Sequence, residues 1–215
     1  MAQFASDAFT GTTGDLLTTY SANWTQHPNS ATTAQIASGR VRVTAGGLAS
    51  LYYHSGSPAN ADYSVLADIH ELSDPTSADA GVVGRLSTSA ATFYFARHAK
   101  FPSPATDAWQ LFKCVAGTFT QLGSNSTDAI TTGTSAQVML RMEGTSIALY
   151  KRGEATATIS VTDSAITAAG KAGLRIFGDS PSPTDTNLYH LDNFLAVDKP
   201  SFVPRRPNFT HMLVR

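Results

Sequence analysis

Tyr63-Ser64-Val65-Leu66-Ala67-Asp68-Ile69 places an apolar side chain at every second position. Successive side chains of a β-strand point to opposite faces of its sheet, so this spacing is typical of a strand with one buried face. The same alternation recurs along the chain, in residues 40–44, 50–54, 81–86, 92–97, 109–115, 137–142, 146–150, 156–161, 172–177 and 189–197.

Turn-forming residues separate these runs, as at Gly46-Gly47, Asp74-Pro75 and Ser180-Pro181-Ser182-Pro183. A single turn of helix is the most that residues 165–170 could form. Many short strands with turns between them predict an all-β fold, an antiparallel two-sheet jelly-roll sandwich. A length of 215 residues fits one such domain.

The composition excludes several classes of protein. Only 14% of the residues are charged and 42% are hydrophobic, whereas a disordered chain has high net charge and few apolar residues. The formal net charge is −1 without a dense basic block, so we expect no nucleic-acid partner. Apolar stretches are too short to predict a membrane span.

The N-terminal sequence and the cysteine content bear on where the protein acts. Residues 1–7 lack the basic start and apolar run of a secretory signal peptide, and Cys114 is the only cysteine. We therefore expect a protein made in a host cytoplasm and released in a virion. An extracellular location, reached by another route, is the alternative.

The two ends of the chain carry a resemblance to a known superfamily. Asp7-Ala8-Phe9, Gly14 to Leu17 and Trp24 resemble the opening of concanavalin A-like (laminin G-like) lectin and glucanase jelly rolls, and residues 170–175 and 191–194 are similar to their end. The resemblance covers about residues 5–198. It implies that the first and last strands lie side by side. It implies fold more than function, because such folds host lectins, glycan hydrolases and structural modules.

Residues 199–215 differ from the jelly-roll domain predicted over residues 1–198. Three prolines disfavour helix and central strand, and the segment is basic and rich in apolar side chains. We expect an extended C-terminal docking arm, the alternatives being a free tail or an arm folded back on its own sandwich. Its predicted assembly contacts are Phe202, Arg205, Arg206, Phe209, Met212 and Leu213.

No pattern in the sequence predicts catalysis. Glycan hydrolases of the resembling fold carry Glu-x-Asp-x-(x)-Glu on one strand, and the nearest match, Asp68-Ile69-His70-Glu71, lacks the second glutamate. No Gly-x-Ser-x-Gly elbow is present, and a lone strand cysteine such as Cys114 is typical of packing. We expect no catalytic residues and no enzyme activity.

No cofactor is expected beyond a structural calcium ion, which the resemblance places near the first and last strands. Asp7 and Asp192 are the matching positions. The alternative is that these aspartates satisfy backbone N–H groups at turns and strand ends.

Glycan binding requires exposed aromatic rings flanked by polar groups. The candidates are Tyr53, Tyr94 and Trp109, with Arg97 and His98 as polar partners and a loop at residues 98–108 as a rim. Phe93, Phe95 and Arg97 would share the face opposite Tyr94. Packing in the core is the alternative role of these aromatic residues.

These observations predict a non-catalytic structural or binding protein. The first hypothesis is a bacteriophage virion component, a capsid decoration or tail protein, which assembles with other virion proteins or with copies of itself into an oligomer. Its jelly-roll body could also bind surface glycans. The alternative is a carbohydrate-binding module or lectin, and the third hypothesis is a glycan hydrolase.

Overall fold

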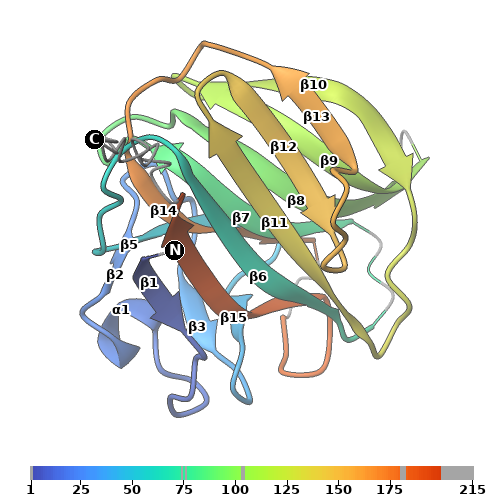
Figure 1. The fold of residues 1–215 in the computed structure, drawn as a ribbon. Coiled ribbons are helices and arrows are strands. Elements are labelled where there is room, and N and C mark those ends of the chain that lie inside the picture. The colour runs from blue at the N-terminus through green and yellow to red at the C-terminus, as the bar shows by residue number, and fades with distance from the viewer. Residues whose placement is uncertain (1, 74, 76, 103–104, 180–182, 200–215) are drawn as a thin grey trace, which may run out of the picture.

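A computed structural model describes residues 2–73, 75, 77–102, 105–179 and 183–199. These residues form two packed antiparallel sheets, which confirms the predicted all-β jelly-roll sandwich (Figure 1). The one α-helix in this part of the chain is short, α1 (Leu17–Tyr20). No described helix is long and apolar enough to cross a membrane.

The first sheet, here called sheet A, has β6 and β15 near its centre. Its order is β13 (Ile159–Thr162), β12 (Ser146–Lys151), β11 (Ser135–Glu143), β6 (Tyr63–Glu71), β15 (Tyr189–Asp198), β4 (Val41–Val43) and β3 (Ala34–Ile36), with β1 (Gln3–Asp7) also paired to β15.

The second sheet, here called sheet B, has β7 at its centre. Its order is β10 (Thr118–Thr127), β9 (Ala105–Val115), β8 (Phe93–Pro102), β7 (Ala78–Leu86), β14 (Lys171–Gly178), β5 (Leu48–His54) and β2 (Trp24–Gln26).

The first and last strands lie side by side, as the resemblance implied. β1 runs antiparallel to β15, and Asp7 is the register partner of Phe194 (Figure 1). Two strands from opposite ends of the sequence are therefore neighbours in sheet A. The ring of Phe194 packs inward against Trp24 of sheet B, with 4.9 Å between the ring centroids.

The main core fills the space between the sheets and follows the alternation seen in the sequence. Along β6, Tyr63, Val65, Ala67 and Ile69 point inward and are at most 1% exposed, while Asp68 points outward. Removing such apolar surface from water is the main stabilising contribution to a sandwich of this kind, about 1.5–3 kcal/mol for each large side chain.

Two strand regions differ from the expectations. Residues 98–108, expected as a loop, are mostly the ends of β8 and β9. Residues 165–170, for which one turn of helix was the most expected, form none. β10 escaped the pattern search because it is an edge strand that is exposed along most of its length, so nothing requires its residues to alternate. The six predicted assembly contacts of the arm lie outside the described residues.

Candidate functional site

The outer face of sheet B, turned away from sheet A, carries a cluster of apolar side chains. Phe93 and Phe95 point outward and are at most 1% exposed, whereas Tyr94 between them points into the main core. The outward residues form a second, smaller hydrophobic cluster: Leu51, Val83, Leu86, Phe93, Phe95 and Cys114, with Tyr53, Ala91 and Phe112 packed against it.

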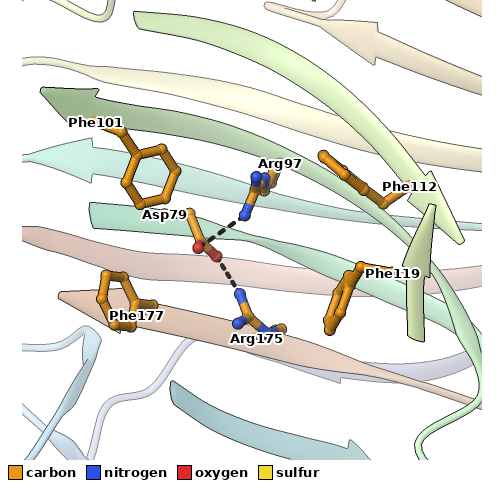
Figure 2. Close-up of a pocket in the computed structure, with 7 residues that line it drawn as sticks. All are labelled: Asp79, Arg97, Phe101, Phe112, Phe119, Arg175 and Phe177. Atoms are coloured by element: carbon orange, nitrogen blue, oxygen red, sulfur yellow. Dashed lines mark hydrogen bonds and ion pairs between the residues drawn. The ribbon is translucent and has the colours of Figure 1, made fainter. Parts of the chain in front are cut away.

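One end of this outer face is hollowed into a pocket of about 290 Å³. Five neighbouring strands contribute side chains to it, so the antiparallel pairing of sheet B holds the pocket in shape. Figure 2 shows four phenylalanine rings arranged in two pairs on either side of three charged groups. The lining residues are Asp79, Arg97, Phe101, Phe112, Phe119, Arg175 and Phe177.

The three charged groups form one ion-paired cluster, here called the Asp79 triad. Arg97 donates from Nη1 to Oδ2 of Asp79 at 2.8 Å, and Arg175 donates from Nη1 to the other carboxylate oxygen, Oδ1. The Asp79 side chain is only 3% exposed. A carboxylate so removed from water requires such charge-assisted partners, and each arginine fixes one of its oxygens.

Hydrogen bonds and ring contacts hold the Arg97 guanidinium from several sides. Its Nε donates to Oε1 of Gln110 at 2.9 Å, and Gln110 in turn donates to Asn125 at 3.0 Å. The guanidinium carbon lies 4.5 Å from the ring centroid of Phe112 and 5.4 Å from that of Phe101. The aromatic walls thus pack against the charged floor through cation–π contacts, which fixes both.

Burial is the main influence on the protonation of this cluster. Loss of hydration lowers the pKa of Arg97, the nearby Arg175 lowers it further, and Asp79 acts in the opposite direction. Even a lowered arginine pKa leaves the guanidinium charged at neutral pH. The pocket therefore presents fixed charges in a partly apolar setting, where they interact with a ligand more strongly than in open water.

The structure brings together only part of the predicted glycan site. Arg97 lines the pocket, and Tyr53 lies on the same outer face but against His27, away from the pocket lining. Tyr94, His98 and Trp109 are fully buried between the sheets, so their prediction as glycan contacts is wrong.

Each of these three side chains points inward and has a polar partner there. The Tyr94 hydroxyl lies 2.7 Å from Oδ1 of Asp163, and the Trp109 indole donates to the Asp128 carbonyl at 2.9 Å. Nδ1 of His98 lies 2.9 Å from the hydroxyl of Tyr189. Their burial therefore leaves these groups hydrogen-bonded within the protein.

Most of the pocket was missed from the sequence. The available signal was an arginine two positions from an aromatic residue, which occurs as Phe95-x-Arg97 and Arg175-x-Phe177. In a strand this spacing puts both side chains on one face. Asp79 carried no such signal, because its partners come from other strands.

Asp7 and Asp192, the predicted calcium ligands, are not brought together. Asp7 lies inward, where it accepts hydrogen bonds from the Trp24 indole at 2.8 Å and the Tyr20 hydroxyl at 2.7 Å. Asp192 is paired in register with the outward Asp68. The described residues contain no group of three or more His, Cys, Asp and Glu side chains placed to hold a metal ion.

Comparisons with known proteins place this architecture among known folds. No protein-family model and no curated protein matches the sequence. The structure is similar to the carbohydrate-binding module CBM66 from Bacillus subtilis, with 17% identity and a TM-score of 0.61 over 81% of this chain and 94% of that one.

Two further structures match over most of their length. The metal-free carbohydrate recognition domain of Emp46p has 7% identity and a TM-score of 0.60, covering 91% of this chain and 95% of its own. A glycosyl hydrolase family protein from Mycobacterium fortuitum has 12% identity and a TM-score of 0.59, and the match covers 92% of this chain and 100% of that one. At such identities the likeness shows the fold alone: the chain has a concanavalin A-like jelly-roll fold.

Proposed function

We propose that this protein is a non-catalytic carbohydrate-binding protein and that the pocket on the outer face of sheet B holds a sugar unit. The observation that carries the proposal is the pairing of four phenylalanine rings with the fixed Asp79 triad. A sugar ring has apolar C–H faces and a polar rim, so aromatic walls beside a few oriented polar groups suit it.

The fold supports this proposal. Two of the similar structures are named as a carbohydrate-binding module and a carbohydrate recognition domain. Fold similarity is an analogy, since such sandwiches host several functions, and the argument for this chain therefore rests on its own pocket.

Catalysis is the less supported reading, although another similar structure is named as a glycosyl hydrolase family protein. Most glycoside hydrolases use two carboxyl groups that face each other across the scissile bond, about 5–9.5 Å apart. Among the described residues that line the pocket, Asp79 is the only acid, and two arginines bind its oxygens. Asp79 is therefore poorly placed to act as a proton donor or nucleophile.

The virion role is a second proposal, and it concerns the other side of the molecule. A groove of about 370 Å³ on the outer face of sheet A has apolar walls, and Lys199, the last described residue, lines it. The docking arm would therefore begin beside an apolar surface. The groove lining includes Leu66, Met139, Leu195, Val197 and Asp198.

Light scattering tests this assembly role. We expect the full chain to form a defined oligomer and a version ending at Asp198 to be a monomer. The same number of subunits per particle for the two versions would contradict self-assembly through the arm.

A polysaccharide panel in native affinity electrophoresis tests the carbohydrate-binding proposal. We expect retardation by at least one glycan and a loss of about tenfold in affinity, or 1.4 kcal/mol, in the variant Phe119→Ala. Phe119 is 43% exposed at the pocket, and Leu16, 40% exposed near the edge strand β3 of sheet A, provides the matched control Leu16→Ala. Retardation by no glycan, or equal losses in the two variants, would contradict the proposal.

A further inference from the structure

The charges of the pocket do not cancel. Two guanidinium groups face one carboxylate, and none of the other described lining residues is charged. The pocket therefore carries one surplus positive charge, although the whole chain has a formal net charge of −1.

The surplus charge is accessible from the pocket. The side chains of Arg97 and Arg175 are 13% and 15% exposed, against 3% for Asp79. A guanidinium has five N–H donors. Arg97 uses Nε for Gln110 and one Nη1 donor for Asp79, and Arg175 uses one Nη1 donor for Asp79. No hydrogen bond to a described residue uses the remaining donors, and none of their nitrogens is buried without a partner, so these donors are accessible to a ligand.

The surroundings favour a negatively charged occupant over a neutral one. Burial lowers the pKa of Arg97, Asp79 raises it and the like charge of Arg175 lowers it, so one carboxylate is shared between two guanidinium groups of like charge. Asp79 lies between them and neutralises one of the two positive charges, and an anionic ligand at their exposed donors would neutralise the other. The phenylalanine rings make the surroundings of the charged pair less polar than open water, which strengthens its attraction for an anion.

We propose that the pocket binds an acidic sugar unit, a uronate or a related sugar acid, whose carboxylate is held by Arg97 and Arg175 while its ring lies between the phenylalanine walls. This inference rests on the proposed function and narrows it to one substrate class. A planar carboxylate matches the two parallel N–H groups of a guanidinium, and its single charge equals the surplus of the pocket.

The test compares acidic polysaccharides with their own neutral forms. Polygalacturonate, alginate, hyaluronate and glucuronoxylan are each reduced at the carboxyl group, which keeps the stereochemistry of the sugar and removes the charge. With the full chain in isothermal titration calorimetry, we expect at least one acidic polymer to bind about tenfold or more tightly than its reduced form, with an affinity that falls as salt is added.

Variants assign the effect to the pocket. Arg175→Met removes one guanidinium, and we expect it to lose at least about tenfold in affinity for the acidic polymer. Arg42 provides the matched control, because it is 12% exposed and ion-paired to Asp185 at 3.1 Å, but lies in sheet A. Arg42→Met should leave binding within about twofold of the parent. If Arg175→Met does not fold, Arg175→Lys keeps the charge without the planar fork, and a loss of about fivefold is expected.

The outcomes separate this inference from the proposed function. Equal binding of an acidic polymer and its reduced form would overturn the acidic-sugar inference and leave carbohydrate binding intact. A second overturning result is dextran sulfate that binds as tightly as the acidic polymer and loses as much affinity in Arg175→Met. That result would show recognition of negative charge without recognition of a sugar acid. Binding of no polymer, acidic or neutral, would overturn both proposals.

Discussion

Arg97 on β8 and Arg175 on β14 face each other across Gly81, their common register partner on β7. Gly81 has no side chain, and Asp79, two residues earlier on β7, places its carboxylate between the two guanidinium groups (Figure 2). A Cβ atom at Gly81 would lie 2.0 Å from the Ala96 carbonyl oxygen and 2.7 Å from the Cα of Arg97. The arrangement of the triad therefore depends on a glycine at this position.

Removing the charge of Asp79 should destabilise the fold. Asp79→Asn leaves two nearly buried guanidinium groups facing each other without a counterion, and we expect the free energy of unfolding to fall by about 3–5 kcal/mol. Urea denaturation measures this change. The same substitution at the partly exposed Asp15 should stay within about 0.5 kcal/mol of the parent, and a similar small change at Asp79 would contradict the structural role of the triad.

Arg85 should tolerate no replacement, because it joins three separate segments of backbone. It is 2% exposed and donates to the carbonyl groups of Ala61 at 3.0 Å, Ile166 at 2.7 Å and Gly144 at 2.9 Å. A lysine has one ammonium group and cannot bind three carbonyls so far apart, so Arg85→Lys should lower the free energy of unfolding by about 2–4 kcal/mol.

The control for this prediction is Arg152→Lys, because the Arg152 side chain is 37% exposed and paired to Asp128 at the surface. We expect a change below about 1 kcal/mol there. Equal midpoints of urea denaturation for the two lysine variants would contradict the buried, segment-joining role of Arg85.

The sequence predicted the architecture well, because alternation and turns are local signals. The run from Tyr63 to Ile69 became β6 with the expected residues buried, and the resemblance at both ends predicted the pairing of β1 with β15. Edge strands were the exception. β10 has water on most of its surface, so its sequence is not constrained to alternate.

The site was predicted poorly, and the reason lies in residues 93–97. Both faces of this strand are aromatic or apolar, since Phe93 and Phe95 alternate with Tyr94. The alternation therefore assigns the side chains to two faces but does not indicate which face points inward. Sheet B is largely buried on both faces near β7, whose nine residues are all buried. Asp79 could not be recognised as part of a site, because its arginine partners come from β8 and β14.

Stability should fall as the solution is made acidic, because burial lowers the pKa of several histidines, most strongly that of His98 and His190. Burial lowers the pKa of His98 to about 4, against the opposing effect of Asp107, and burial together with Arg40 lowers that of His190 to about 4. In the unfolded chain a histidine takes up its proton near pH 6.5. The contribution of His98 or His190 to the free energy of unfolding is therefore complete above about pH 7 and is lost between about pH 6.5 and 4. It amounts to about 3 kcal/mol per histidine.

Urea denaturation at pH values between 7 and 5 measures this effect. Glu71, whose pKa is raised by burial, offsets part of the loss because the folded protein takes up its proton first. The variant His98→Gln should take up one proton fewer on unfolding than the parent. The slope of its free energy of unfolding against pH should therefore be smaller by about 1.4 kcal/mol per pH unit. An unchanged slope would show that folding does not lower the pKa of His98.

Calcium should not stabilise the protein through Asp7 and Asp192. Asp7 receives hydrogen bonds on both carboxylate oxygens, from the backbone N–H of Phe9 at 2.7 Å, the Tyr20 hydroxyl and the Trp24 indole. A calcium ion would need six to eight oxygen ligands and would have to displace these donors, while Asp192 points to the opposite face of sheet A. We expect the same Tm with excess calcium as with a chelator.

The two aspartates themselves should differ sharply in their contribution to stability. Asp7→Ala removes the acceptor of three hydrogen bonds beside the core and should lower the free energy of unfolding by about 2–4 kcal/mol, because the buried Trp24 indole and the partly buried Tyr20 hydroxyl lose their partner. Asp192→Ala, whose carboxylate accepts from Asn193 at the strand bulge, should cost about 1 kcal/mol or less. A rise in Tm on adding calcium that both variants abolish would instead show that the two carboxylates share an ion, and would restore the site that the resemblance implied.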